Sequence, residues 1–181
     1  SCSLVKSSHI MSECMPKMPE KKEFLTFAEK LANASRAILV EAAHGSQIGE
    51  MKSDGSPVTH IDQAVEERLR HMIAGRYADH GVFGEEYSDA NTVEDYTWVL
   101  DPIDGTLSFL GGLPVYGTLI ALLRGGVPMI GVIDMPATAE RWVGCTETTT
   151  LRNGAPVRTR PCQDLAQAML STSNIDFYDG N

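Results

Sequence analysis

The 181-residue sequence predicts an α+β fold, in which two N-terminal helices pack on a mainly antiparallel sheet. Two observations lead to this class. Before residue 80, apolar residues recur at every third or fourth position, which is typical of amphipathic helices. After residue 80, short apolar runs alternate with turn residues, which is typical of strands. The composition, with 43% hydrophobic and 22% charged residues, is that of a globular domain and excludes a disordered, collagen-like or coiled-coil chain.

The first helix is expected to follow Pro19 and to end at Gly45. Its apolar face consists of Phe24, Phe27, Leu31, Ala34, Ile38 and Ala42. The apolar face of the second helix consists of Ile61, Val65, Leu69, Met72, Ile73 and Tyr77. Thr59 is the expected N-cap of the second helix, and Asp62 stands three residues later, where the acid of a capping box belongs.

Strands are expected wherever a short apolar run ends at turn residues. Residues 48–59 contain Asp54-Gly55, a hairpin signal between two short strands. The later strands are expected at Gly81–Gly84, Thr97–Leu100, Gly117–Arg124, Val127–Asp134, Glu140–Gly144, Thr148–Leu151 and Ala168–Ser173. Gly125-Gly126 and Asn153-Gly154 predict tight turns, and a short helix is expected near Asp164 to Gln167.

The charge balance restricts the classes of partner. Fifteen basic and 24 acidic residues give a formal charge of −9, so we expect no binding to nucleic acid, whose phosphates repel such a chain. The excess acid suits a protein that gathers carboxylates around divalent cations, although a merely soluble acidic surface is the commoner cause of such a charge. No stretch approaches 18 consecutive apolar residues, so no membrane span is expected.

The four cysteines are far apart and form no CxxC pair, which indicates a reduced intracellular chain. Residues 1–19 lack periodicity and are interpreted as a disordered tail or the remnant of a transit peptide.

The segment WVLDPIDGT, residues 98–106, carries the strongest chemical signal. An apolar strand delivers Asp101 and Asp104, and Pro102 restricts the backbone between them. Held on the same side of the chain, the two carboxylates can share a hard cation such as Mg²⁺, with the carbonyl of Ile103 as a further ligand. Gly105-Thr106 then opens a helical turn, where free backbone N–H groups favour a phosphate.

Each of these residues also has a purely structural explanation. Two aspartates three positions apart are commonly a solvated turn, Glu85-Glu86 a surface loop, Asp62 and Thr106 helix caps. Their combination in one short run with a proline and a glycine is what favours a phosphate ester and a metal.

Three segments resemble the inositol monophosphatase superfamily of magnesium-dependent phosphatases. They are SDGSPVTHID at residues 53–62, GEE at residues 84–86 and WVLDPIDGTLSF at residues 98–109, in the expected order and at similar spacing. Within that superfamily, residues 117–136, 140–144, 148–154 and 162–174 are similar to the plant-type histidinol-phosphate phosphatases.

The resemblance implies a layered α/β/α/β/α sugar-phosphatase fold, of which this chain would form the first half. Residues 20–181 are interpreted as an N-terminal metal- and phosphate-binding domain, truncated before a C-terminal segment that carries a further metal-ligating aspartate. The resemblance also implies a homodimer for the complete protein. The location would be the plastid in a plant or alga and the cytoplasm otherwise.

The roles carried over by the resemblance fall on the same acidic residues. Mg²⁺ would be held by Glu85, Asp101, the Ile103 carbonyl and Asp104. The phosphorylated substrate would be bound by Glu85, Ile103, Asp104, Gly105 and Thr106. Asp62 and the Thr106 hydroxyl would be catalytic and would orient the attacking water, with Glu86 supporting the ligands from behind.

The implied reaction is the hydrolysis of L-histidinol phosphate to L-histidinol and phosphate, a stage of histidine biosynthesis. The alternative substrates are inositol monophosphate and the 3′-phosphate of a phosphoadenosine nucleotide. An alternative of another class is a truncated, non-catalytic paralogue that acts as a dimerisation module.

Overall fold

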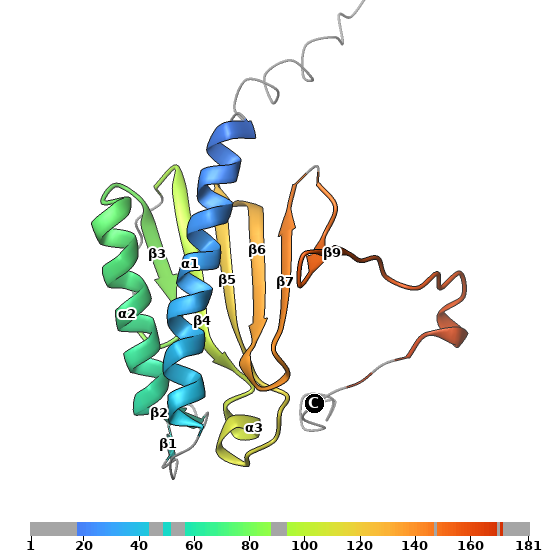
Figure 1. The fold of residues 1–181 in the computed structure, drawn as a ribbon, viewed down its shortest axis with the longest axis horizontal. Helices are drawn as coiled ribbons and strands as arrows, with labels where there is room; N and C mark the ends of the chain where they lie inside the picture. Colours follow the sequence, from blue (N-terminus) through green and yellow to red (C-terminus); the bar gives the residue numbers. More distant parts are fainter. Residues whose placement is uncertain are drawn as a thin grey trace, which may run out of the picture.

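The computed structural model describes residues 18–43, 49–51, 57–87, 94–146, 148–169 and 171. Helices α1 (Met18–Ala42) and α2 (His60–Arg76) lie side by side across one face of a seven-stranded sheet (Figure 1). The short strands β1 (Gly49–Met51) and β2 (Pro57–Thr59) pair antiparallel, as the sequence predicts. The predicted helix end at Gly45 and the Asp54-Gly55 turn lie outside the described residues.

The sheet has the order β3-β4-β5-β6-β7-β8-β9, and only its first pair, β3 with β4, is parallel. Its strands are β3 (Gly81–Gly84), β4 (Tyr96–Asp104), β5 (Gly117–Arg124), β6 (Val127–Met135), β7 (Glu140–Cys145), β8 (Leu151–Arg152) and β9 (Ala155–Pro156). The short helix α3 (Thr106–Leu110) follows β4, and single 3₁₀ turns occupy η1 (Pro136–Thr138) and η2 (Leu165–Gln167). The α+β class with a mainly antiparallel sheet is therefore confirmed.

The two tight turns form where the sequence places them. Gly125 and Gly126 join β5 to β6 with φ angles of 53° and 79°. Asn153 and Gly154 join β8 to β9 with φ angles of 49° and 80°. Type I′ hairpin turns require positive φ at both central residues, and their twist matches that of the paired strands.

Three strand predictions need correction. β4 runs on to Asp104 instead of ending at Leu100, because Asp104 still pairs with β5. The strand expected at Thr148–Leu151 begins only at Leu151, where pairing with β7 starts. The described residues of the predicted strand Ala168–Ser173 form no strand, because the chain leaves the sheet after β9 and finds no edge to pair with (Figure 1).

The hydrophobic core lies between the helices and the sheet. Alternate residues of the central strands face α1 and α2 and are fully or almost fully buried: Trp98, Leu100, Ile120, Leu122, Ile130 and Val132. The opposite face is also apolar and borders an open cavity of about 520 Å³, whose lining includes Val99, Leu119, Ile133 and Trp142. No helix among the described residues is long and apolar enough to cross a membrane.

A buried cluster of charged side chains connects α1 to strands β6 and β7. Asp134 on β6 is fully buried and accepts two hydrogen bonds from Arg36, at 2.9 and 2.7 Å. It accepts a third from Nε of Arg141 on β7, at 2.5 Å. The hydrogen bond with Asp134 raises the pKa of Arg36. The cluster therefore fixes the position of α1 across β6 and β7.

Replacing Asp134 by asparagine should lower the free energy of unfolding by about 2–4 kcal/mol, because two partly buried arginines lose their counter-charge. The measurement is urea-induced unfolding followed by circular dichroism. Arg152→Gln is the matched control, since Arg152 pairs with Glu140 at the surface and its loss should cost less than about 1 kcal/mol. Equal losses in the two variants would contradict the assignment.

Candidate active site

The two aspartates of the sequence motif lie within β4, on either side of an irregularity in its pairing. The register with β5 shifts between Asp101 and Asp104, and Pro102, which has no N–H group to pair, occupies this bulge. The Thr118 hydroxyl donates to the Pro102 carbonyl at 2.9 Å, and the Ser35 hydroxyl on α1 lies 2.5 Å from that of Thr118. The bulge is thus held from β5 and, through a buried hydroxyl pair, from α1.

Parallel pairing of β3 with β4 brings Glu85 to Asp101. Gly84 is the register partner of Leu100, so the residue after each stands at the same edge of the sheet. The two carboxyl groups share a hydrogen bond. Helix α2 begins and α3 follows at this edge as well, at the lower end of the sheet in Figure 1.

Asp62 lies in the first turn of α2, where the capping box predicted from the sequence is present. Its Oδ2 accepts from the backbone N–H of Thr59 at 2.7 Å and from the Thr59 hydroxyl at 2.6 Å. The Thr59 Oγ1 accepts in turn from the N–H groups of Ile61 and Asp62. Asp62 is buried, with 1% of its surface exposed, so its carboxylate is held in one orientation.

The surroundings of Asp101 strongly disfavour a negative charge on its carboxyl group. Burial, followed by the charge of Glu85, the hydrogen bond with Glu85 and the charges of Asp104 and Asp62, raises the pKa of Asp101 to about 8. Burial also raises the pKa of Asp62, against the opposing effect of its hydrogen bonds with Thr59. Four predicted site residues, Asp62, Glu85, Asp101 and Asp104, therefore act on one another electrostatically.

One observation fits a hard cation at this place. Oδ1 of Asp101 is a buried oxygen without a hydrogen-bond partner among the described residues, although such atoms are normally paired. The nearby donors are carboxylates and carbonyls, the ligands that Mg²⁺ prefers. Within the same described ranges, no three acidic, histidine or cysteine side chains form a ready-made metal cluster. Asp101 and Glu85 thus present two carboxyl groups that could hold a cation, and a complete metal site would need further oxygen donors.

The start of α3 combines a left-handed residue with a close backbone approach. Gly105 has φ of 83°, and a Cβ at this position would lie 2.9 Å from the carbonyl oxygen of Val115. Only glycine satisfies both conditions. The Thr106 hydroxyl donates to the Ile103 carbonyl at 3.0 Å, so these two predicted site residues are in contact. The hydrogen bonds recorded for Asp62 involve Thr59, so the structure does not pair it with Thr106.

Sequence reasoning overlooked a buried acid one helical turn after Asp62. Glu66 is fully buried on α2 and bonds to Arg70 and to the backbone N–H of Glu86. Its signal was an acid on the apolar face of the helix, followed four residues later by an arginine. Ser35 and Thr118 gave no comparable signal, because single hydroxyl residues are common in helices and strands.

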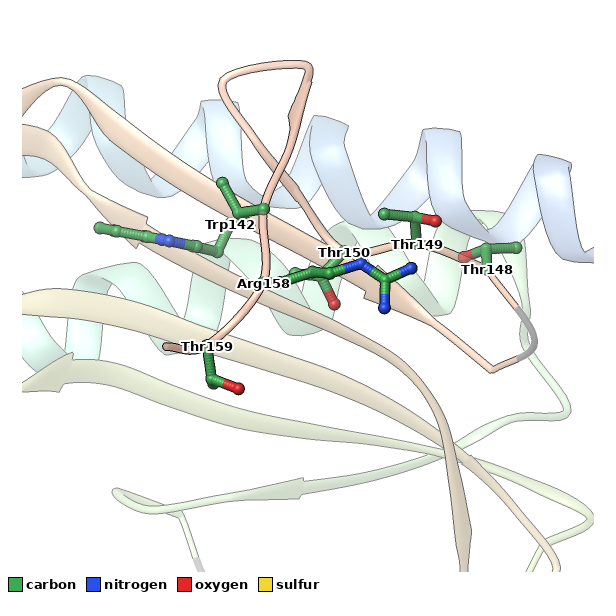
Figure 2. Close-up of a pocket in the computed structure, with 7 residues that line it drawn as sticks. Trp142, Thr148, Thr149, Thr150, Arg158 and Thr159 are labelled. Atoms are coloured by element: carbon green, nitrogen blue, oxygen red, sulfur yellow. The ribbon is translucent and has the colours of Figure 1, made fainter. Parts of the chain in front are cut away.

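A second hollow adjoins the open cavity on the helix-free face of the sheet, with which it shares Trp142 and Thr150. A cavity of about 650 Å³ is bordered by Trp142, residues 148–150 and residues 157–159. Figure 2 shows the Arg158 guanidinium and the threonine hydroxyls lying around it. Its lining contains no acidic side chain, so it does not contribute to the carboxylate group described above.

Comparisons with known proteins agree with this geometry. A sequence profile of the inositol monophosphatase family matches residues 20–179. The chain is 41% identical over 161 residues to the bifunctional phosphatase IMPL2, chloroplastic, of Arabidopsis thaliana, covering 88% of this chain and 46% of that protein. It is 44% identical over 93 residues to a histidinol-phosphatase of Mycobacterium tuberculosis, covering 51% and 36%.

Among solved structures, an inositol monophosphatase from Zymomonas mobilis matches with a TM-score of 0.65 at 38% identity, covering 78% of this chain and 54% of that one. The chain therefore spans about half the length of the relatives it matches. The family profile extends from α1 to beyond η2 and includes the whole acidic edge, so the chain belongs to the inositol monophosphatase family.

Proposed function

We propose that the protein is a magnesium-dependent phosphomonoesterase whose substrate is L-histidinol phosphate. The observation that carries the proposal is the unpartnered, buried oxygen of Asp101 beside Glu85. Such a group is costly to retain in a fold without a counter-charge, and a divalent cation supplies one. The family of phosphatases to which the chain belongs supports the same chemistry.

Support for the substrate comes from the relatives. A histidinol-phosphatase is 44% identical over its matched region, and the four segments at residues 117–136, 140–144, 148–154 and 162–174 resemble the same branch in sequence. Inositol monophosphate remains the second candidate, because an inositol monophosphatase structure is 38% identical. Since the chain spans about half of these relatives, substrate selection also depends on what the remaining half contributes in them.

In this proposal Asp101, Glu85, Asp104 and the Ile103 carbonyl would hold Mg²⁺. The cation would lower the pKa of water and neutralise charge on the leaving oxygen. The side chain of Asp101 offers its free oxygen, whereas the Ile103 carbonyl already accepts a hydrogen bond from Thr106 and has one lone pair left.

The remaining residues would bind the phosphate and prepare the water. The N–H groups at the start of α3, at Gly105 and Thr106, are free of helical acceptors and would donate to phosphate oxygens. Asp62 would accept the proton of the attacking water, since burial raises its pKa toward the range useful for a base. The bonds from Thr59 keep its carboxylate from rotating.

Phosphate release from three esters at matched concentrations tests the substrate. We expect L-histidinol phosphate to be hydrolysed at least about tenfold faster than inositol 1-phosphate or the 3′-phosphate of phosphoadenosine. The assay is made on the full product of the gene and on residues 1–181, with Mg²⁺ and with EDTA. Equal rates on all three esters would refute the substrate. Absence of release from any of them would favour the non-catalytic dimerisation module.

Replacing Asp101 by asparagine should reduce magnesium-dependent turnover by about a thousandfold or more, because a charge on the cation is lost. Initial rates of phosphate release at saturating substrate provide the measurement. Asp79→Asn is the control, since Asp79 is exposed in the loop before β3 and makes the same change of charge. An Asp101→Asn enzyme that keeps more than about a tenth of the activity would exclude Asp101 from the site.

The raised pKa of Asp101 makes a prediction about stability without metal. Between its ordinary value of 3.8 and about 8, the folded chain keeps a proton on Asp101 that the unfolded chain releases. The free energy of unfolding should therefore fall as the pH rises through this range, and Asp62 contributes in the same direction. Asp101→Asn should flatten the decline, and Mg²⁺ should oppose it, because a cation favours the charged carboxylate.

Urea unfolding in EDTA at several pH values between about 5 and about 8 measures this dependence. The Asp79→Asn variant should keep the slope of the natural chain. Identical slopes for Asp101→Asn and the natural chain would show that Asp101 is not the group that titrates.

A further inference from the structure

A buried glutamate lies directly beneath the turn that carries Glu85. Glu66 on α2 has no exposed surface. Its Oε1 accepts from Nε of Arg70 at 2.7 Å, and its Oε2 accepts from the backbone N–H of Glu86 at 2.8 Å. Both carboxylate oxygens are thus in use, one toward its own helix and one toward the segment that follows β3. This carboxylate connects α2 to the residue next to Glu85.

The same carboxylate fills the space at Gly84, on the other side of Glu85. A Cβ at position 84 would lie 1.9 Å from Oε1 of Glu66, far inside the contact distance of real atoms. Glycine therefore lets the backbone close directly onto the buried carboxylate. Arg70 extends the contact, because its Nη2 donates to the Tyr87 carbonyl at 3.1 Å and its guanidinium lies 5.9 Å from the Tyr87 ring centre.

We propose that Glu66 is a positioning residue, which holds residues 84–87 in place and thereby fixes the carboxylate of Glu85 beside Asp101. The Glu85 side chain is exposed, so surrounding side chains do not enclose it. Its position therefore depends on its backbone as well as on its hydrogen bond with Asp101, and Glu66 contacts that backbone at Gly84 and Glu86. The effect of Glu66 on metal binding rests on the proposed function, in which Glu85 is a ligand. The effect of Glu66 on the position of residues 84–87 does not depend on that function.

Two physical features suit Glu66 to this role. The pairing with Arg70 offsets the cost of burying the Glu66 carboxylate, whose other oxygen accepts from the Glu86 N–H. It also lies four residues after Asp62, on the same face of α2. One rigid helix therefore positions both the proposed base and the turn that bears a proposed ligand. Residues that orient metal ligands in this way typically change metal affinity by 10–100-fold when replaced.

The first test measures hydrogen exchange at the backbone amide of Glu86 and needs no metal. In Glu66→Gln, either the Arg70 bond or the Glu86 bond loses its acceptor, because one oxygen becomes an NH₂ group. The Glu86 amide should exchange its hydrogen about tenfold faster or more in EDTA, measured by NMR or by mass spectrometry of a peptide covering 84–87. Glu67→Gln is the matched control, since Glu67 is the exposed neighbour on the same helix. The amides of β4 report global unfolding and should keep their rates in both variants.

The second test measures Mg²⁺ binding by calorimetric titration at a temperature where circular dichroism shows each variant folded. Glu66→Gln should bind Mg²⁺ about tenfold more weakly or worse, and Glu67→Gln should bind as the natural chain does.

A third pair of variants tests the contact at Gly84 itself. Gly84→Ala should weaken Mg²⁺ binding, and the shorter acid in Gly84→Ala/Glu66→Asp should restore part of it by making room for the added methyl group.

The outcomes separate this proposal from the proposed function. Faster Glu86 exchange together with weaker Mg²⁺ binding in Glu66→Gln supports a positioning role. Unchanged exchange, or faster exchange with unchanged Mg²⁺ binding, overturns it. If Glu66→Gln does not fold, the Gly84 pair decides, and a double variant that binds no better than Gly84→Ala overturns the proposal. If the natural chain binds no Mg²⁺, the proposed function fails, and the exchange rates alone judge whether Glu66 holds the turn.

Discussion

Mutual repulsion among carboxylates at one edge of the sheet is the constraint on which the site depends. Asp101 is half-buried and lies within hydrogen-bonding reach of Glu85, with the charges of Asp104 and Asp62 nearby. Left in water, such groups would separate, because each added negative charge raises the cost of the next. The fold therefore has to hold them together by means other than their own interactions, and most of the surrounding structure serves that requirement.

The holding contacts reach back to both helices. Thr59 fixes Asp62 at the start of α2, and Glu66 of the same helix contacts the backbone on both sides of Glu85. On β4, the bulge at Pro102 is bonded to Thr118, whose hydroxyl contacts α1. The rest of β4 is anchored by Trp98, which is completely buried and donates to His80. The acids therefore occupy one end of a strand whose other end is locked into the core.

Local signals made much of this predictable from the sequence. The capping box of α2 and the turns at residues 125–126 and 153–154 depend on residues adjacent in the chain, so their chemistry alone specifies them. The motif around Asp101 was recognisable for the same reason. Strand ends were harder, because Leu151 becomes a strand only by pairing with β7, and residues 168–169 do not because they meet no partner. Buried polar contacts such as Glu66 with Glu86 join distant parts of the chain, and no local pattern reveals them.

The acids of the fold differ in how their charge is balanced. Asp134 is bonded by two arginines, and Glu66 by an arginine and a backbone N–H. Asp62 accepts from Thr59 at the start of a helix, where the dipole favours an anion.

Asp101 differs from all three. Burial, and after it the charges of the neighbouring acids, raise the pKa of Asp101, and one of its oxygens has no partner among the described residues. A carboxyl group in that condition stays protonated near neutral pH unless a positive charge arrives. In the proposed function, a bound cation would balance the charge at Asp101, as arginines do at Asp134 and Glu66. Among these acids, Asp101 is therefore the one at which a cation would both stabilise the fold and take part in the proposed reaction.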